Sequence, residues 1–195
     1  MELKKEDRRV RKTKRLLRQG LSQLILEKSI KDITVRELTE LVDINRGTFY
    51  IHYRDIYDMV AQLEDEILNE LSTILTSHTA REGTDIIQEA RALLVELYTY
   101  VADNRDLCMA LLGQNGDIAF LRSLEKMVHD GCLKALLDSF PQAHVQQLEY
   151  LYEFASAGSA ATMRTWLSEG MKESPEDMAA LTQQLISGII RGVLM

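Results

Sequence analysis

Helix-breaking residues are scarce in this chain of 195 residues. Prolines occur only at positions 141 and 175, and there are ten glycines. Because proline interrupts helices and glycine weakens them, most of the chain can form long helices. No segment shows a strong strand pattern. The sequence therefore predicts an all-α fold, in which an N-terminal three-helix bundle is joined by a long helix to a C-terminal helical bundle.

Charge is distributed unevenly along the chain. Residues 1–20 contain nine lysines and arginines against three acids, whereas residues 61–195 contain nine basic and twenty acidic residues. A basic end on an acidic body indicates an anionic partner near the N-terminus. A solvated tail is the alternative that charge alone leaves open.

Several classes of protein do not fit this composition. No apolar run reaches about 18 residues, and no apolar segment follows the charged N-terminus, so we expect neither a membrane span nor a secretory signal. Two cysteines, Cys108 and Cys132, are too few for a disulfide scaffold. We therefore expect a cytoplasmic protein.

The first sixty residues are predicted to form three helices, of which the second and third are short. Apolar residues repeat at helical spacing over residues 8–26 (Val10, Leu17, Leu21, Leu24 and Ile25). Thr34 and Glu37 have the spacing of a capping box, which predicts a helix over 35–42 with Val35, Leu38, Leu41 and Val42 facing inward. Asn45 is a favourable N-cap for a helix over 46–51. Two short helices around such a turn form a helix-turn-helix unit.

The third helix carries the residue types that read DNA. Phe49 and Tyr53 are four apart and are expected to pack inward. Arg46, Thr48 and Tyr50 then face outward beside Gly47, where a helix in the major groove contacts bases. Hydroxyl and imidazole groups of Thr34, Tyr50 and His52 are placed to contact phosphates. The alternative is the ordinary surface of a three-helix bundle.

The segments ITVREL (33–38) and INRGTFYIHY (44–53) resemble the TetR/AcrR family of regulators over residues 8–60. This resemblance implies symmetric dimers bound to palindromic operators in double-stranded DNA. It implies base contacts from Arg46, Gly47 and Thr48, and phosphate contacts from Thr34, Tyr50 and His52. Members of the family usually have a lysine where this chain has Ile56, and Arg54 is the expected replacement.

Further helices are predicted along the remaining chain, giving a DNA-binding domain over 1–55 and a dimerisation and sensor domain over 56–195. Asp55 caps a helix that runs to Ser77, and Thr84 caps the next. Shorter helices are expected over 105–112 and 117–137, separated by residues 113–116. The segment 143–169 is rich in small residues, and Ser174-Pro175 begins a final amphipathic helix. The last two long helices are expected to form a four-helix interface with a second copy, or else an internal seam.

We expect the activity of this protein to be controlled by a small-molecule effector. Its pocket is predicted from residues of mixed polarity in the body (Tyr98, Asn104, Met109, His129 and Trp166). The residues Gly158, Trp166, Gly170 and Pro175 resemble the C-terminal domain of dihydroxyacetone-kinase regulators, so control by a protein partner is the alternative. We expect no cofactor, no metal and no enzymatic activity. His129 with Cys132 and the two thiols remain weaker metal or redox alternatives, and a helical enzyme or scaffold remains a remote one.

Overall fold

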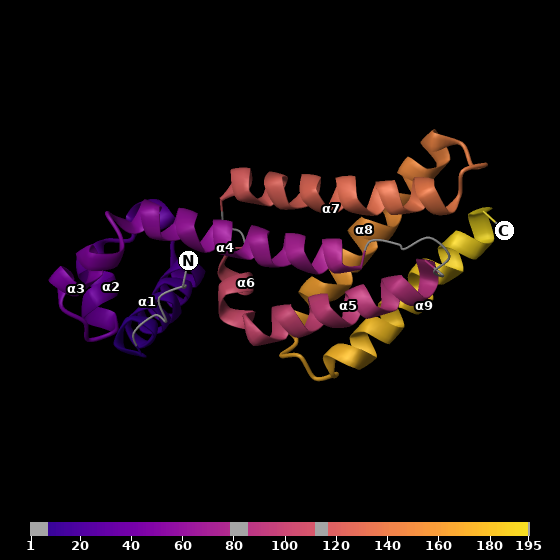
Figure 1. The fold of residues 1–195 in the computed structure, drawn as a ribbon. Coiled ribbons are helices and arrows are strands. Elements are labelled where there is room, and N and C mark those ends of the chain that lie inside the picture. The colour runs from indigo at the N-terminus through magenta and orange to yellow at the C-terminus, as the bar shows by residue number, and fades with distance from the viewer. Residues whose placement is uncertain (1–7, 79–85, 112–116, 195) are drawn as a thin grey trace. The chain divides into compact units, whose positions relative to one another are not determined.

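The computed structural model describes residues 8–78, 86–111 and 117–194, which form α-helices without a strand (Figure 1). This confirms the predicted all-α fold. None of the described helices is long and apolar enough to cross a membrane. The helices are α1 (Arg8–Glu27), α2 (Val35–Leu41), α3 (Arg46–His52), α4 (Ile56–Ser77), α5 (Ile86–Asp103), α6 (Arg105–Leu111), α7 (Ile118–Ser139), α8 (Val145–Ser168) and α9 (Pro175–Leu194), with a 3-10 turn at Ile30–Asp32.

Two compact units make up the chain. The N-terminal unit comprises residues 1–67 and 105–121, and the C-terminal unit comprises residues 68–104 and 122–195. Helix α4 contributes to both units, and α6 belongs with α1 although about eighty residues separate them in the sequence. The division of the chain into functional domains after residue 55 stays a prediction.

The core of the N-terminal unit forms where α1 packs against α2 and α6, and α2 against α3 (Figure 1). The predicted apolar positions of α1 are buried from Leu17 onward. In α2 the expected pattern is partly wrong, because Leu41 is 44% exposed while Thr39 is 1% exposed. The hydroxyl of Thr39 donates within the helix to the carbonyl oxygens of Val35 and Arg36, so its burial leaves no polar group unsatisfied.

Gly20 lies inside α1 at the seam with α2. A Cβ atom at this position would collide with Cγ1 of Val42 and would lie 3.0 Å from Cδ1 of Leu38. Glycine in a helix interior costs roughly 1 kcal/mol relative to alanine. At Gly20 this cost is offset by the close approach of α1 to α2, the first helix of the helix-turn-helix.

In the C-terminal unit, α9 packs against both α5 and α8. The Tyr98 hydroxyl lies 2.8 Å from Oγ1 of Thr182, and its ring meets Trp166 edge-on at a centroid distance of 5.2 Å. A second cluster contains Leu136, Leu148 and Ile190. The first pair of contacts joins α5 to α9 and α8, and the apolar cluster joins α7 to α8 and α9.

Capping residues begin several helices where the sequence predicts. Asp55 accepts a hydrogen bond from the N–H of Asp58 at the start of α4, and Ser174 accepts one from the N–H of Asp177 at the start of α9. The predicted Thr84 cap and the break at 113–116 lie outside the described residues.

Candidate nucleic-acid interface

A tight turn sets α3 relative to α2. Asp43 has a φ of 51°, a left-handed conformation that aspartate tolerates better than most residues. This lets the N–H of Ile44 donate to the carbonyl oxygen of Thr39 at 2.9 Å. Oδ1 of Asn45 then accepts from the N–H of Gly47 at 2.7 Å, which confirms the predicted N-cap. The local sequence thus fixes where α3 starts.

Gly47 has a structural reason as well as a functional one. A Cβ atom here would lie 3.1 Å from Oδ1 of Asn45, the oxygen that caps the helix. A side chain at this position would therefore press on the cap. Gly47 itself adds no side chain to the first turn of α3, so that the backbone at this position is open to a close approach.

The N-cap of α2 is Thr34, whose hydroxyl oxygen accepts from the N–H of Glu37 at 3.2 Å. This is one half of the predicted capping box. The carboxylate of Glu37 contacts Nζ of Lys28, an ion pair that the sequence analysis did not anticipate. The hydroxyl proton of Thr34 stays available for a donor contact at the surface, where the residue is exposed.

One side of α3 is buried and the other is open. Phe49 is fully buried and Tyr53 is 5% exposed, with ring centroids 5.5 Å apart, as predicted. Tyr50 is 57% exposed, and Ile51 is 76% exposed. Ile51 is an exposed residue that was not among the predicted contacts, although its place two residues after Phe49 on a helix was the available signal.

The predicted DNA-contact residues differ in their exposure to solvent. Arg46 and Gly47 are exposed, whereas Thr48 and His52 are half-buried. His52 meets Tyr53 edge-on at 6.3 Å, which fixes its ring beside the core. The structure therefore brings Arg46, Gly47 and Tyr50 to the open surface, with Thr48 and His52 at its margins.

A single carboxylate on α2 contacts two arginines. Oε1 of Glu40 lies 2.8 Å from Nε of Arg36 and 3.6 Å from a terminal nitrogen of Arg46. One acid on α2 thus orients a guanidinium at the start of α3.

Arg54 is paired in the same way with Asp58, at 3.1 Å between its terminal nitrogen and Oδ1. The N–H of Arg54 and then its guanidinium hold the pKa of Asp58 below its ordinary value. To contact a DNA phosphate, the guanidinium of Arg54 must either keep its ion pair with Asp58 and use its remaining N–H groups, or break that ion pair.

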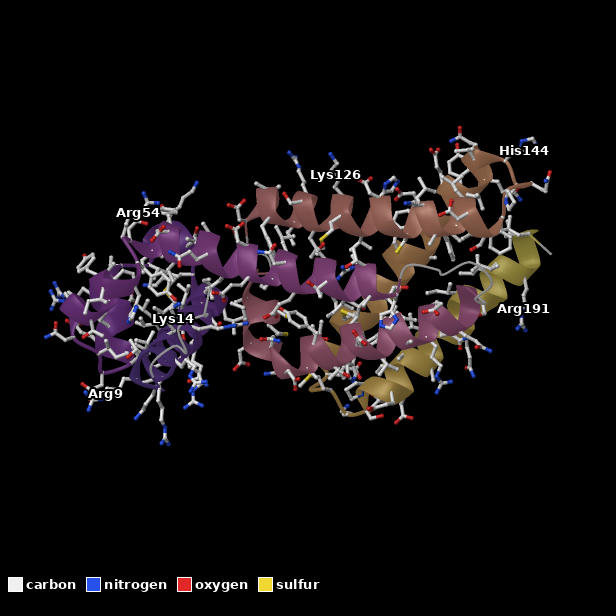
Figure 2. All side chains as sticks on the ribbon, in the orientation of Figure 1. Arg9, Lys14, Arg54, Lys126, His144 and Arg191 are labelled. Atoms are coloured by element: carbon white, nitrogen blue, oxygen red, sulfur yellow. The ribbon has the colours of Figure 1, made fainter. Side chains whose placement is uncertain are left out.

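Helix α1 adds positive charge to the same unit. Figure 2 shows Arg9 and Lys14 on α1, and Arg54 just beyond α3, with nitrogen-tipped side chains around them. The first turn of α3 contains no acid, and neither does the first turn of α1. Such a surface attracts a polyanion through charge that carries no sequence information, while the groups on α3 supply hydrogen-bond donors.

The five predicted effector residues differ in their surroundings, and a shared pocket stays a prediction. Tyr98 and Trp166 contact each other but are 0% and 3% exposed, so they belong to the filled core. Nδ2 of Asn104 donates to the carbonyl oxygen of Tyr100, and His129 packs edge-on against Tyr152 on α8. Met109 lies on α6 in the other compact unit.

The two thiols lie in apolar surroundings. Burial raises the pKa of Cys108 to about 11 and raises that of Cys132 as well, so neither is readily ionised at neutral pH. Within the described ranges, no three histidine, cysteine, aspartate or glutamate side chains are arranged to hold a metal ion. These surroundings disfavour the redox alternative.

Comparison with known proteins connects this geometry to a family. Residues 88–188 match the family model TetR_C_8, described as a transcriptional regulator C-terminal region. The matched range contains Gly158, Trp166 and Gly170, on which part of the C-terminal resemblance rests. The uncharacterized HTH-type transcriptional regulator YxbF of Bacillus subtilis is 19% identical over 175 residues, which are 88% of this chain and only 44% of that protein.

Solved structures with the same fold are similarly distant in sequence. The fatty acid degradation regulator FadR of Bacillus halodurans is 16% identical with a TM-score of 0.66, covering 90% of this chain and 94% of that one. Thermus thermophilus FadR, a repressor solved with lauroyl-CoA, is 16% identical with a TM-score of 0.54, covering 89% and 93%. The family match covers more than half of the chain, and this chain belongs to the TetR family of transcriptional regulators.

Proposed function

We propose that this protein is a homodimeric repressor that binds a palindromic operator in double-stranded DNA through α3. The observation that carries the proposal is the open side of α3, where Arg46 and Tyr50 flank Gly47 on a helix that contains no acid. Guanidinium and hydroxyl groups at this spacing suit guanine edges and phosphates. We place this activity in the cytoplasm, where bacterial-type operators are accessible.

The outer faces of α8 and α9 support the homodimer. On α8, Tyr150 and Phe154 are 69% and 68% exposed, and on α9 Leu181 and Leu185 are 46% and 54% exposed. An exposed apolar set of this size on two packed helices indicates a protein contact. A second copy is the occupant we propose, because the two helices can then complete a four-helix bundle.

Small residues continue both apolar stripes. On α8 the spacing of Tyr150 and Phe154 leads to Ala157 and Ala161, and on α9 that of Leu181 and Leu185 leads to Gly188 and Gly192. Along each helix the large residues of the stripe thus precede the small ones. Large residues of one copy can fill the space over small residues of the other, which is the complementarity that a two-fold interface requires.

We further propose that an effector binds the C-terminal unit and lowers operator affinity. The support is the relative that was solved with lauroyl-CoA, together with an open recess in this unit lined by Asn69, Glu70, Thr73, Ile74 and Tyr100. A ligand acts here only by preferring the released state, so operator DNA must weaken its binding by the same factor.

Selection of bound sequences from a random duplex pool tests the central proposal. We expect an inverted repeat with half-sites separated by about one helical turn or a multiple of it. Recovery of no enriched sequence at moderate salt would contradict operator binding.

Titration with lauroyl-CoA, followed by thermal stability and operator release, tests the effector. Free lauric acid and coenzyme A serve as controls. A shift in stability without operator release would contradict the regulatory coupling, and no response in either assay would favour control by a protein partner.

A further inference from the structure

Ile51 is the most exposed large apolar side chain in the described chain, at 76%. A single exposed isoleucine is common on protein surfaces and needs no explanation by itself. Its position is what distinguishes it, because it lies on the helix that carries Arg46 and Tyr50. It follows Phe49 by two residues, which places it about 200° around the helix from that buried ring.

The residue one turn earlier makes Ile51 the outermost group of this helix. Gly47 precedes it by four residues and therefore lies on the same side of α3. Because glycine has no side chain, the preceding turn adds no side chain beside the isoleucine from that position. Ile51 and Tyr50 are thus the large exposed side chains along this helix, and Arg46 is exposed at its start.

An aliphatic group at this point has a specific complement in DNA. The edges of base pairs in the major groove present hydrogen-bond donors and acceptors, and the 5-methyl group of thymine is their apolar feature. A branched side chain cannot bond to the polar edges, and it would leave them without a partner if it were pressed against them. Contact with a methyl group removes apolar surface from water on both sides.

We propose that Ile51 is a specificity-determining residue that packs against a thymine 5-methyl group in each operator half-site. This inference rests on the proposed function, since it assumes that α3 enters the major groove. It adds a position of the operator at which thymine is required for its methyl group and not for its hydrogen bonds.

Replacement of thymine by 2′-deoxyuridine tests this directly, because it removes the methyl group and keeps the base pair. On the selected operator, each thymine of the half-site is replaced in turn, and affinity is measured for wild type and for Ile51→Ala. Loss of one buried methyl group is expected to weaken wild-type binding by about fourfold at one thymine position per half-site. Ile51→Ala is expected to bind the thymine operator more weakly and to be insensitive to deoxyuridine at that position alone.

Two further variants serve as controls. Ile118→Ala removes an isoleucine of similar exposure, 66%, in the same compact unit but outside the helix-turn-helix, and it should keep the wild-type response to deoxyuridine. Ile51→Val keeps branched methyl groups and should retain most of the sensitivity. If an operator is found but every deoxyuridine substitution affects Ile51→Ala as much as wild type, the inference is wrong while the proposed function stands. If no operator is found, both are overturned.

Discussion

The open side of α3 and the outer faces of α8 and α9 expose side chains of opposite character. On α3 the exposed groups are a guanidinium, a phenol and one aliphatic residue around Gly47, whereas α8 and α9 expose Tyr150, Phe154, Leu181 and Leu185. A mostly polar face suits hydrated DNA, and an apolar face suits another protein surface. Where several exposed side chains lie on the same helices, their chemistry indicates which kind of partner the surface suits.

Glycines inside helices of the two regions differ in what surrounds them. A Cβ atom at Gly20 would collide with Val42 of the same protomer, whereas a Cβ atom at Gly158, Gly188 or Gly192 would meet nothing within 4 Å. Glycine lowers the stability of a helix, and at these positions no close contact within the protomer compensates for that loss. Gly131 on α7 is open in the same way, so Gly158, Gly188 and Gly192 leave room for a second chain on α8 and α9, while the exposed apolar residues of these helices carry the proposal.

The largest expected effect is that of Gly188→Leu. In the protomer the added side chain has open space, so folding should be retained, but it would separate two closely packed helices in a dimer. We expect a monomer by light scattering, and operator affinity reduced by about a hundredfold or more, because two linked reading heads no longer bind together. A variant that remains dimeric would show that the interface lies elsewhere.

Substitutions on α3 should separate base contacts from phosphate contacts. Arg46→Ala is expected to cost about 1–3 kcal/mol on the selected operator and to relax the preference at one position. Tyr50→Phe should weaken binding on all sequences alike, since a phosphate contact carries no sequence information. Competition assays on matched and scrambled duplexes measure both. Equal losses on both duplexes for Arg46→Ala would contradict its role as a base contact.

Alanine at Gly20 and alanine at Gly158 form a matched pair. Gly20→Ala must push α1 away from Val42 and is expected to lower the free energy of unfolding by about 1–3 kcal/mol. Gly158→Ala fills open space and should raise the stability of the isolated protomer by about 0.5–1 kcal/mol. Urea denaturation of both variants, made monomeric by Gly188→Leu, gives the comparison. A stabilised Gly20→Ala would refute the close approach of α1 and α2.

The last expected effect depends on pH and concerns Glu64 on α4. Burial, and then the negative charges of Asp117 and Asp65, raise the pKa of Glu64 from 4.5 to about 7. The folded state therefore holds the proton more tightly between pH 4.5 and 7, and the contribution of this group to stability falls as pH rises through that interval.

Glu64→Gln removes this dependence. Its stability should match that of wild type near pH 4.5 and exceed it by about 1–2 kcal/mol above pH 7, after allowance for solvent screening. Thermal denaturation across this pH range measures the difference. A difference that does not change with pH would show that burial of Glu64 has no effect on its ionisation.

Much of the fold and part of the site follow from the sequence by itself. The scarcity of helix breakers sets the fold class, and capping residues such as Asn45 and Ser174 set where helices begin, because these are local effects within one turn of chain. The inward position of Phe49 likewise follows from helical spacing. These features depend on residues that are close in sequence, so they can be predicted from the order of residues along the chain.

Only the tertiary structure decides which distant segments meet. It places α6 in the unit of α1, makes Leu41 exposed and Thr39 buried, and encloses Tyr98 and Trp166 in a core that the sequence suggested as a pocket lining. It also shows that Ile51 is exposed on α3. Helical periodicity gives the direction of a side chain but not what lies opposite it. Burial depends on that opposite partner, which only the packed chain supplies.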